Sequence, residues 1–384
     1  MIRSIVESLD MKIVSETESG LELDVPAYRV DVQRPCDVVE DILRIYGYNN
    51  VEIPTQLKSS LTIPSDIDKA YHRQNVIGEQ LVGCGFREIL NNSLSKTAYY
   101  TELNKYTEET TVKVMNPLSN DLGVMRQSLL FGGLESISRN INHKMPNLRF
   151  FEFGNCYHYS PEKKNDEDPI KAYTEEMHLG MWTTGKRVEG SWAHADEQSS
   201  FYELKAYVMN IFTRLGVNPG IVVTESSDNN VFGKALALKA RSGKVLCEMG
   251  IVSHKLLKKM DIEQEVFYAD INWDNMMRAI KKNEVLYHDI CKFPSVSRDL
   301  ALLLDKNVQF EQIEQIARQT EKKLLKSVEL FDVYEGKNLP EGKKSYAVNF
   351  ILQDETKTLN DKQIEAIMSK LINNLKTKLG AELR

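Results

Sequence analysis

The sequence is poor in cysteine and histidine, which limits the metal and redox chemistry that it can support. Five cysteines and seven histidines are scattered over 384 residues. Because no C-x-x-C, H-x-x-x-H or H-E-x-x-H pattern occurs, the local sequence indicates neither a zinc ribbon nor a histidine-based metal site. An odd number of widely spaced cysteines also argues against a disulfide framework and is typical of a reducing cytoplasm.

Long apolar runs and nucleotide-binding motifs are also missing. No stretch is long and apolar enough to span a bilayer, and the mean hydropathy is −0.38. The first residues, MIRSIVESLDMKIVSE, carry charges and lack the apolar centre of a secretion signal. Neither G-x-G-x-x-G after a strand nor G-x-x-x-x-G-K-[ST] occurs, which excludes the common dinucleotide-binding and P-loop folds. We therefore expect no contact with a membrane.

The composition is that of a globular protein with more than one domain. Hydrophobic residues make up 42% and charged residues 27% of the chain, so a sizeable core is expected. A length of 384 residues predicts two or three domains. The net charge is −6, of which residues 291–384 contribute +2 and the other residues −8. Charge alone therefore does not indicate nucleic-acid binding.

Hydrophobic patterning divides the chain into three regions, 1–57, 58–285 and 291–384. The first is expected to contain a helix that runs into a strand, a half-buried strand at LELDVP, and a helix at DVVEDILRIY that ends at Gly47. This region is small for an independent domain, and we expect that the chain begins inside a domain.

The second region mixes helices and strands without a regular βαβ alternation. Helices are expected at 73–82, 128–141 and 201–215, and strands at 147–160, 179–185, 220–225, 235–240, 244–252 and 266–273. This order predicts an α+β module with long antiparallel connections.

The third region has the order β-α-β-β-α-β, which is the ferredoxin-like pattern. In its strand at 343–355, one face carries apolar side chains at every second position from Tyr346 to Leu352. Asn360 is expected to cap a long helix that Gly380 ends, and the last four residues are expected to form a strand.

Two clusters of charged residues are candidates for binding. Asp37, Glu40 and Asp41 share one face of a predicted first helical turn, and Asp31 lies just upstream. Oxygen ligands of this type suit Mg²⁺, but an ordinary acidic helix start explains the same residues and is favoured by the sequence pattern alone.

The second cluster is basic and lies in residues 291–384, among Phe293, Phe331, Tyr334 and Tyr346. It consists of Arg298, Lys322, Lys323, Lys326, Lys343, Lys344 and Arg384. A sheet with exposed basic and aromatic side chains can bind RNA by phosphate contacts and stacking. The alternative is a solvated charged surface, which the net charge of +2 slightly favours.

Two further motifs have simpler explanations. GCGFR at 83–87 suggests a phosphate loop but fits a helix stop and tight turn better. In LRFFEFG, alternation places Arg149 and Phe151 on one strand face and Phe150 and Glu152 on the other. Arg149 could clamp a phosphate, although packing and an ion pair are the default. No nucleophile with an adjacent base is evident.

Several long segments, in the same order, resemble the C-terminal portion of bacterial phenylalanyl-tRNA synthetase β subunits. VPAYRVDVQRPCDVVEDILRIYGYNNVEIP is similar to that family's small winged-helix-like domain. HRQNVIGEQLVGCGFREILNNSL and VMNPLSNDLGVMRQSLLFGGLESISRNINHKMPNLRFFEFGNCY resemble its catalytic-like module. FPSVSRDLALLLD, LFDVYEG, LPEGKKSYAVNFILQDETKTLND and GAELR resemble its ferredoxin-like anticodon-binding domain.

The resemblance implies an α+β multidomain fold. Residues 1–57 would be a winged-helix-like domain, truncated at its N-terminus, and residues 58–285 a degenerate class II synthetase module with an antiparallel sheet. Residues 291–384 would be a ferredoxin-like anticodon-binding domain.

The resemblance also changes the interpretation of the acidic cluster. It implies that Asp31, Asp37, Glu40 and Asp41 bind a Mg²⁺ that is shared with the α subunit. The family usually has glutamate at the last of these positions, and aspartate is shorter by one methylene, so direct ligation by Asp41 is open.

No catalytic residue is expected in this chain. The resemblance implies that the α subunit uses ATP and holds its phosphates with a G-x-G-x-x-R helix start, which this chain lacks. KVLCEMGIVSHKLLKKMDI occupies the corresponding stretch, and residues 72–94 are expected to contact the α subunit. The family's editing domain is not represented in the sequence, so no editing activity is expected.

The implied function is that of a non-catalytic part of a tRNA ligase in the cytoplasm. It would support the catalytic α subunit in a heterotetramer of two α and two β subunits, and it would bind tRNA(Phe) but no DNA. The expected tRNA contacts are Arg298, Lys322, Lys323, Lys343, Lys344 and Arg384. One alternative is a stand-alone RNA-binding or assembly protein. Another is an independent adenylate-forming enzyme, against which the missing motif counts, or a Mg²⁺-dependent hydrolase, against which the lack of a partner acid or base near the carboxylates counts.

Overall fold

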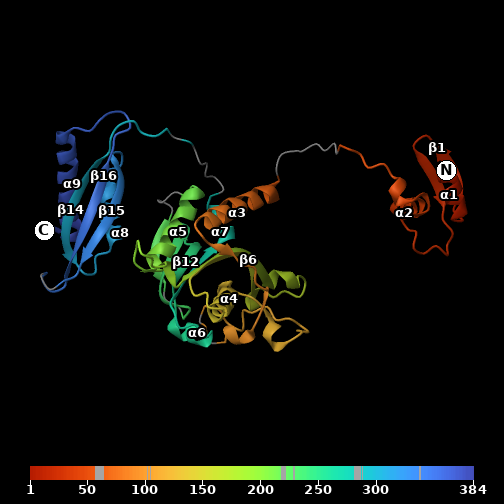
Figure 1. Ribbon diagram of the computed structural model, residues 1–384, viewed down its shortest axis with the longest axis horizontal. Helices are drawn as coiled ribbons and strands as arrows, with labels where there is room; N and C mark the ends of the chain where they lie inside the picture. The colour runs from red at the N-terminus through yellow and green to blue at the C-terminus, as the bar shows by residue number, and fades with distance from the viewer. Residues whose placement is uncertain are drawn as a thin grey trace.

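The structure of the chain is a computed structural model, shown in Figure 1. It describes residues 1–56, 65–101, 103, 105–217, 222–227, 230–280, 287, 289–336 and 339–384. Within these residues, no helix is both long and apolar enough to cross a membrane. The predicted domain limits at 57/58 and at 285 fall outside the described residues, so the division of the chain at these points stays a prediction.

Residues 1–50 form a helix, a two-stranded hairpin and a second helix. The elements are α1 (Ile2–Ser8), β1 (Lys12–Thr17), β2 (Gly20–Asp24), α2 (Pro35–Tyr46) and the 3₁₀ helix η1 (Tyr48–Asn50). The expected helix-to-strand order and the end of α2 at Gly47, which has a φ of 94°, are confirmed. The apolar stripe of α2 is only partly covered, because Val39 and Ile45 are 53% and 51% exposed.

The middle of the chain is built on a seven-stranded sheet. Its strands are β3 (Arg87–Glu88), β6 (Leu148–Tyr159), β7 (Tyr173–Thr184), β10 (Val222–Ser227), β11 (Phe232–Ala240), β12 (Val245–Val252) and β13 (Val266–Asn272). They lie in the order β10-β11-β12-β13-β7-β6-β3. All neighbours are antiparallel except β3 and β6, so the predicted α+β architecture is confirmed.

Helices cover both faces of this sheet. They are α3 (Asp66–Gly83), α4 (Leu130–Asn142), α5 (Phe201–Arg214), α6 (His254–Lys259) and α7 (Trp273–Ala279). One hydrophobic core joins a sheet face to α3, α5 and α7, and a second core joins the other face to α4 and α6. The alternation predicted for β6 is confirmed, since Phe151 lies in the first core and Phe150 in the second.

Short elements connect the main strands and helices. They are β4 (Leu94–Ser95), β5 (Val124–Met125), β8 (Lys186–Val188), β9 (Glu197–Gln198), η2 (Thr97–Tyr99), η3 (Asn120–Leu122), η4 (Pro161–Lys163) and η5 (Pro169–Ala172). The GCGFR segment is a helix end and tight turn, as expected. α3 ends at Gly83, and Gly85 has a φ of 85°, which an L side chain rarely adopts.

The C-terminal part is a four-stranded antiparallel sheet with two helices on one face (Figure 1). Its elements are β14 (Val296–Asp305), α8 (Phe310–Thr320), β15 (Leu325–Tyr334), β16 (Lys343–Leu352), α9 (Asp361–Leu379) and β17 (Glu382–Leu383). The sheet order is β15-β16-β14-β17. The predicted ferredoxin-like fold is confirmed, down to the Asn360 cap of α9 and the left-handed Gly380 that ends it.

Candidate functional site

The four acidic residues predicted to bind Mg²⁺ lie on α2 and just before it. The carboxylate of Asp37 accepts hydrogen bonds from the backbone N–H groups of Gln33 and Arg34, at 3.0 and 2.8 Å. These bonds, with the Arg34 side chain, lower the pKa of Asp37 to about 2. Asp37 therefore stabilises the start of α2, which is the structural role that its position suggested.

Arginines neutralise the whole acidic group. The Arg29 guanidinium lies 3.0 Å from Asp31 Oδ2 and 2.6 Å from Asp41 Oδ2. Hydrogen bonding to Arg29 lowers the pKa of Asp31. Arg44 pairs with Glu40 at 3.0 Å, one helical turn away.

This arrangement does not present a ready cation site. Among the described residues, no group of three or more histidine, cysteine, aspartate or glutamate side chains is placed to hold a metal ion. The oxygen donors suit Mg²⁺ chemically, but two of them are bound by Arg29. The sequence pattern alone favoured an ordinary acidic helix start, and only the family resemblance implied Mg²⁺; neither took account of the arginines beside these carboxylates. Mg²⁺ binding here stays a prediction.

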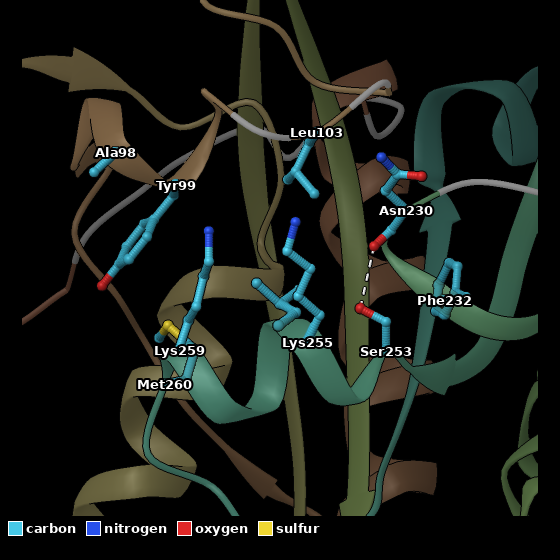
Figure 2. Close-up of a pocket in the computed structure, with 10 residues that line it drawn as sticks. Ala98, Tyr99, Leu103, Asn230, Phe232, Ser253, Lys255, Lys259 and Met260 are labelled. Carbon is cyan, nitrogen blue, oxygen red and sulfur yellow. Dashed lines mark hydrogen bonds between the residues drawn. The ribbon is translucent and has the colours of Figure 1, made fainter.

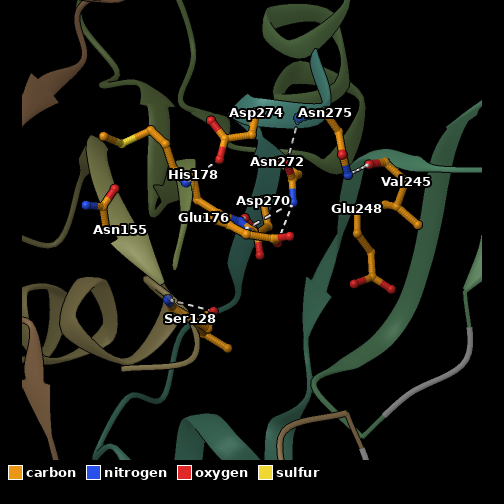
Figure 3. A network of polar contacts seen from close by, with 12 residues as sticks. Ser128, Asn155, Glu176, His178, Val245, Glu248, Asp270, Asn272, Asp274 and Asn275 are labelled. Carbon is orange, nitrogen blue, oxygen red and sulfur yellow. Dashed lines mark hydrogen bonds and ion pairs between the residues drawn. The ribbon is translucent and has the colours of Figure 1, made fainter. Parts of the chain in front are cut away.

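A buried polar network on β7 and β13 was not predicted (Figure 3). His178 Nδ1 lies 2.6 Å from Asp270 Oδ1, and His178 Nε2 lies 3.7 Å from Glu176 Oε2. Asn272 donates a hydrogen bond to Glu176 at 2.9 Å. Strand pairing places Asn272 opposite His178, although the two residues are far apart in sequence, so no local pattern could reveal the contact.

The network holds its histidine in the charged form. Burial alone would lower the pKa of His178, but the carboxylates of Asp270 and Glu176 outweigh burial and raise it to about 10. The pKa of Asp270 is lowered, because the charge of His178 outweighs the effect of burial. An imidazolium at neutral pH has no free lone pair, so His178 cannot serve as a general base or a metal ligand in this state.

Nearby charged groups are also paired within the chain. Lys105 forms an ion pair with Glu248, which lies on β12. Arg126 Nη1 lies 2.7 Å from Glu152 Oε1, and both side chains are buried. The partner of Glu152 was not predicted from LRFFEFG, because Arg126 is 26 residues away.

Arg149 forms an ion pair within the protein, as expected by default from the sequence. It lies 3.3 Å from Glu203 and donates a hydrogen bond to the carbonyl of Arg187 at 2.9 Å. Its guanidinium is therefore used by the protein itself.

A cavity of about 430 Å³ lies beside α6 (Figure 2). Tyr99, Leu103 and Phe232 supply apolar lining, and the side chains of Lys255 and Lys259 extend into the cavity from one helix face. The Tyr99 ring stacks on Phe131 with centroids 4.7 Å apart, which holds this wall in place. No sequence motif indicated this cavity.

The basic residues predicted to contact tRNA form two groups at opposite ends of the C-terminal sheet. Arg298 pairs with Phe350 in the strand register, and Lys322 and Lys323 precede β15 at the same end. All three basic side chains are exposed.

The other group lies where β15 ends and β16 begins. Arg384 lies over the Tyr334 ring at 5.2 Å, and Lys343 pairs with Asp305 at 3.0 Å. Lys344 is buried, with its ammonium 4.5 Å from the centre of the Tyr346 ring. Burial leaves Lys344 little surface for a phosphate contact.

Comparison with known protein families identifies the family of this chain. Residues 53–273 match the family described as phenylalanyl tRNA synthetase beta chain CLM domain. The chain belongs to the phenylalanyl-tRNA synthetase β-chain family. Residues 291–384 match the ferredoxin-fold anticodon binding domain, and residues 1–48 match the tRNA synthetase B5 domain. The resemblance inferred from the motifs is confirmed.

Bacterial relatives named phenylalanine–tRNA ligase beta subunit are similar over the whole chain. The relative from Bacteroides fragilis is 61% identical over 383 residues, which are 100% of this chain and 47% of the relative. The relative from Porphyromonas gingivalis is 50% identical over 384 residues, again 100% and 47%. The relative from Clostridium acetobutylicum is 31% identical over 98% of this chain and 46% of its own length. The chain thus spans about half the length of the curated relatives that it matches.

Proposed function

We propose that this chain is a non-catalytic part of a phenylalanine–tRNA ligase, which supports a catalytic α subunit and binds tRNA(Phe) during ATP-dependent attachment of phenylalanine. The observation that carries the proposal is the ferredoxin-like sheet of residues 291–384, which matches an anticodon-binding domain within a chain of this family. ATP would be bound by the α subunit, and the isolated chain is expected to have no ligase activity.

The polar network of the middle sheet supports a structural role for that module. Its charged side chains are paired with one another, as in His178 with Asp270 and Arg126 with Glu152. Catalysis by electrostatic stabilisation needs charged groups that face the substrate, and here these groups face one another within the sheet instead.

The surface of α3 supports an interface near residues 72–94. Tyr71 and Val82 are 63% and 57% exposed, and both lie on α3. Large apolar side chains of this kind are common at protein interfaces. We assign this surface to the α subunit, in a heterotetramer of two α and two β subunits located in the cytoplasm.

The proposed tRNA contacts use both ends of the C-terminal sheet. Arg298, Lys322 and Lys323 offer charges to phosphates at one end. At the other end, the Tyr334 ring with Arg384 above it offers a surface for a nucleobase, and Phe331 is 59% exposed on the same strand. Lys343 and Lys344 would contribute only after release from their present contacts.

Mg²⁺ binding by Asp31, Asp37, Glu40 and Asp41 is proposed only for the assembled complex. Arg29 would first have to leave Asp31 and Asp41. Isothermal titration of Mg²⁺ into the isolated chain is expected to show no binding at these residues, whereas the complex with the α subunit should bind Mg²⁺ in a manner lost with Asp31→Ala.

The test of the function is co-purification with the cognate α subunit, with Mg²⁺ and again with a chelator. We expect a stoichiometric complex that gains aminoacylation activity only when the remainder of the β subunit is also supplied. Absence of a complex under both conditions would contradict the proposal. Tight tRNA binding without any α subunit association would favour a stand-alone RNA-binding protein.

A further inference from the structure

One tryptophan is fully exposed, and packing within the fold does not explain its position. The chain has three tryptophans, of which Trp182 and Trp273 are buried at 0% and 2% exposure. Trp192 is 100% exposed. Exposing so large an apolar side chain costs solvation free energy, and aromatic residues in such positions are typical anchors of protein interfaces.

Trp192 lies at the tip of an ordered hairpin formed by β8 and β9. The N–H of Ser191 donates to the carbonyl of His194 at 2.9 Å, which closes the turn around Trp192. Below the turn, the Gly190 N–H donates to Asp196 at 2.5 Å. The side chain is therefore presented on a preformed turn, so little conformational entropy would be lost when a partner binds it.

The base of the hairpin is fixed to the central sheet. Asn147 accepts a hydrogen bond from the Lys186 N–H at 2.8 Å and donates one to Glu189 at 2.6 Å. Gly185 has a φ of 76°, and a Cβ there would lie 2.5 Å from the Pro146 carbonyl, so the strand can leave the sheet at this point only with glycine. These contacts tie the base of the hairpin to the central sheet.

The charge of the hairpin disfavours RNA as the partner. Residues 185–199 carry a net charge of −1. Their two cations are used internally, since Lys186 pairs with Asp196 and Arg187 pairs with Glu197, each at 2.9 Å. Cations that are already paired gain little from phosphates. A polypeptide with an apolar pocket is the partner that this chemistry fits.

The position of the hairpin favours one particular polypeptide. A cavity of about 200 Å³ lies between its base and the turn after α3, lined by Gly85, Arg87, Arg149 and Arg187. Arg149 spans the two sides, because it donates to the carbonyls of both Cys84 and Arg187, at 3.4 and 2.9 Å. The hairpin thus continues the surface of residues 72–94, which we assigned to the α subunit.

We propose that Trp192 is an anchor that inserts into an apolar pocket of the catalytic α subunit and fixes the hairpin of residues 185–199 at the subunit interface. This inference rests on the proposed function, because it names a site of contact with the partner assigned there.

The test compares the affinity of the chain for the cognate α subunit before and after substitution. Trp192→Ala is expected to raise the dissociation constant at least tenfold, as for interface hot spots, and Trp192→Phe to raise it by a smaller factor. Ile170→Ala is the matched control. Ile170 is 78% exposed and precedes β7, at the end of the β6–β7 pair away from the hairpin, so its loss should leave the affinity within twofold.

A second readout does not depend on a variant. Trp192 is the single exposed tryptophan among the three, so acrylamide should quench its emission in the free chain, and the complex should protect it. Unchanged affinity of Trp192→Ala, or continued quenching in the complex, would overturn the inference while leaving the proposed function in place. A loss of tRNA affinity without loss of α subunit affinity would also overturn it. Failure of the wild-type chain to bind the α subunit would remove both proposals.

Discussion

The His178–Asp270 pair makes the stability of the central sheet depend on pH in a definite direction. The pKa of His178 is raised to about 10, above the value of about 6.5 expected in an unfolded chain. The stabilising contribution of the imidazolium is therefore complete below about pH 6.5 and is lost as the pH rises toward 10. In that window the folded state holds one proton that the unfolded state does not, so the free energy of unfolding falls by about 1.4 kcal/mol per pH unit.

Asp270→Asn is the perturbation that isolates this contribution. The variant removes the closest carboxylate of His178, and breaking a buried ion pair costs about 3–5 kcal/mol. We expect the lower end of this range at pH 7, because Glu176 remains 3.7 Å from the ring. Between pH 7 and 8.5 the wild-type chain should lose about 2 kcal/mol, and the variant should lose less, because it no longer holds the extra proton as tightly.

Urea unfolding followed by tryptophan emission provides the assay. The three tryptophans are Trp182, Trp192 and Trp273, so their emission reports on the central part of the chain. Glu263→Gln is the control, because Glu263 is exposed near the start of β13 and should leave the pH dependence unchanged. Equal slopes of stability against pH for the wild-type chain and Asp270→Asn would refute the reasoning.

Three further predictions test other parts of the chain. Gly154→Ala should destabilise the central sheet by about 1–3 kcal/mol in urea unfolding, because the new Cβ would lie 2.2 Å from Arg126 Nη2; an unchanged midpoint would show that the arginine moves aside freely. Asn360→Ala should lower the free energy of unfolding by about 1 kcal/mol, because the N-cap of α9 is lost. Denaturant unfolding followed by circular dichroism measures this change, and Asn360→Ser should keep most of the capping free energy. The double variant Lys322→Ala with Lys323→Ala should weaken tRNA(Phe) binding by the complex and make its salt dependence shallower; an identical salt slope in a filter-binding assay would exclude phosphate contacts at this end of the sheet.

The local elements of this protein were predictable because their patterns are local. In the C-terminal part, the strand from Tyr346 to Leu352 buries alternate side chains, and its core follows from period-two alternation. Asn360 and Gly380 begin and end a helix for reasons that involve only neighbouring backbone groups. The order of the motifs along the chain also indicated the protein family, which the comparison with known families confirmed.

The polar contacts were not predictable, because antiparallel pairing joins positions that are distant in the chain. His178 and Asp270 are 92 residues apart, and each position looks unremarkable in its own strand. The prediction of a basic surface was also incomplete, because it did not account for which side chains the fold buries. Lys344 falls on the buried face of β16, where its ammonium lies over Tyr346 instead of facing solvent.

Sequence alone determined the longer helices, most strands and the ferredoxin-like order, because backbone preferences and hydrophobic periods act over a few residues. The short helices α6 and α7 were not predicted. The order of the motifs indicated the family. Tertiary structure decided which charges meet. It placed Arg29 between Asp31 and Asp41, so that these two members of the acidic cluster, for which the resemblance implied Mg²⁺, are neutralised by the chain itself. It also left Trp192 exposed on the hairpin of residues 185–199 while the other two tryptophans were buried. Pairing and exposure depend on the register of distant strands, and only the folded chain establishes that register.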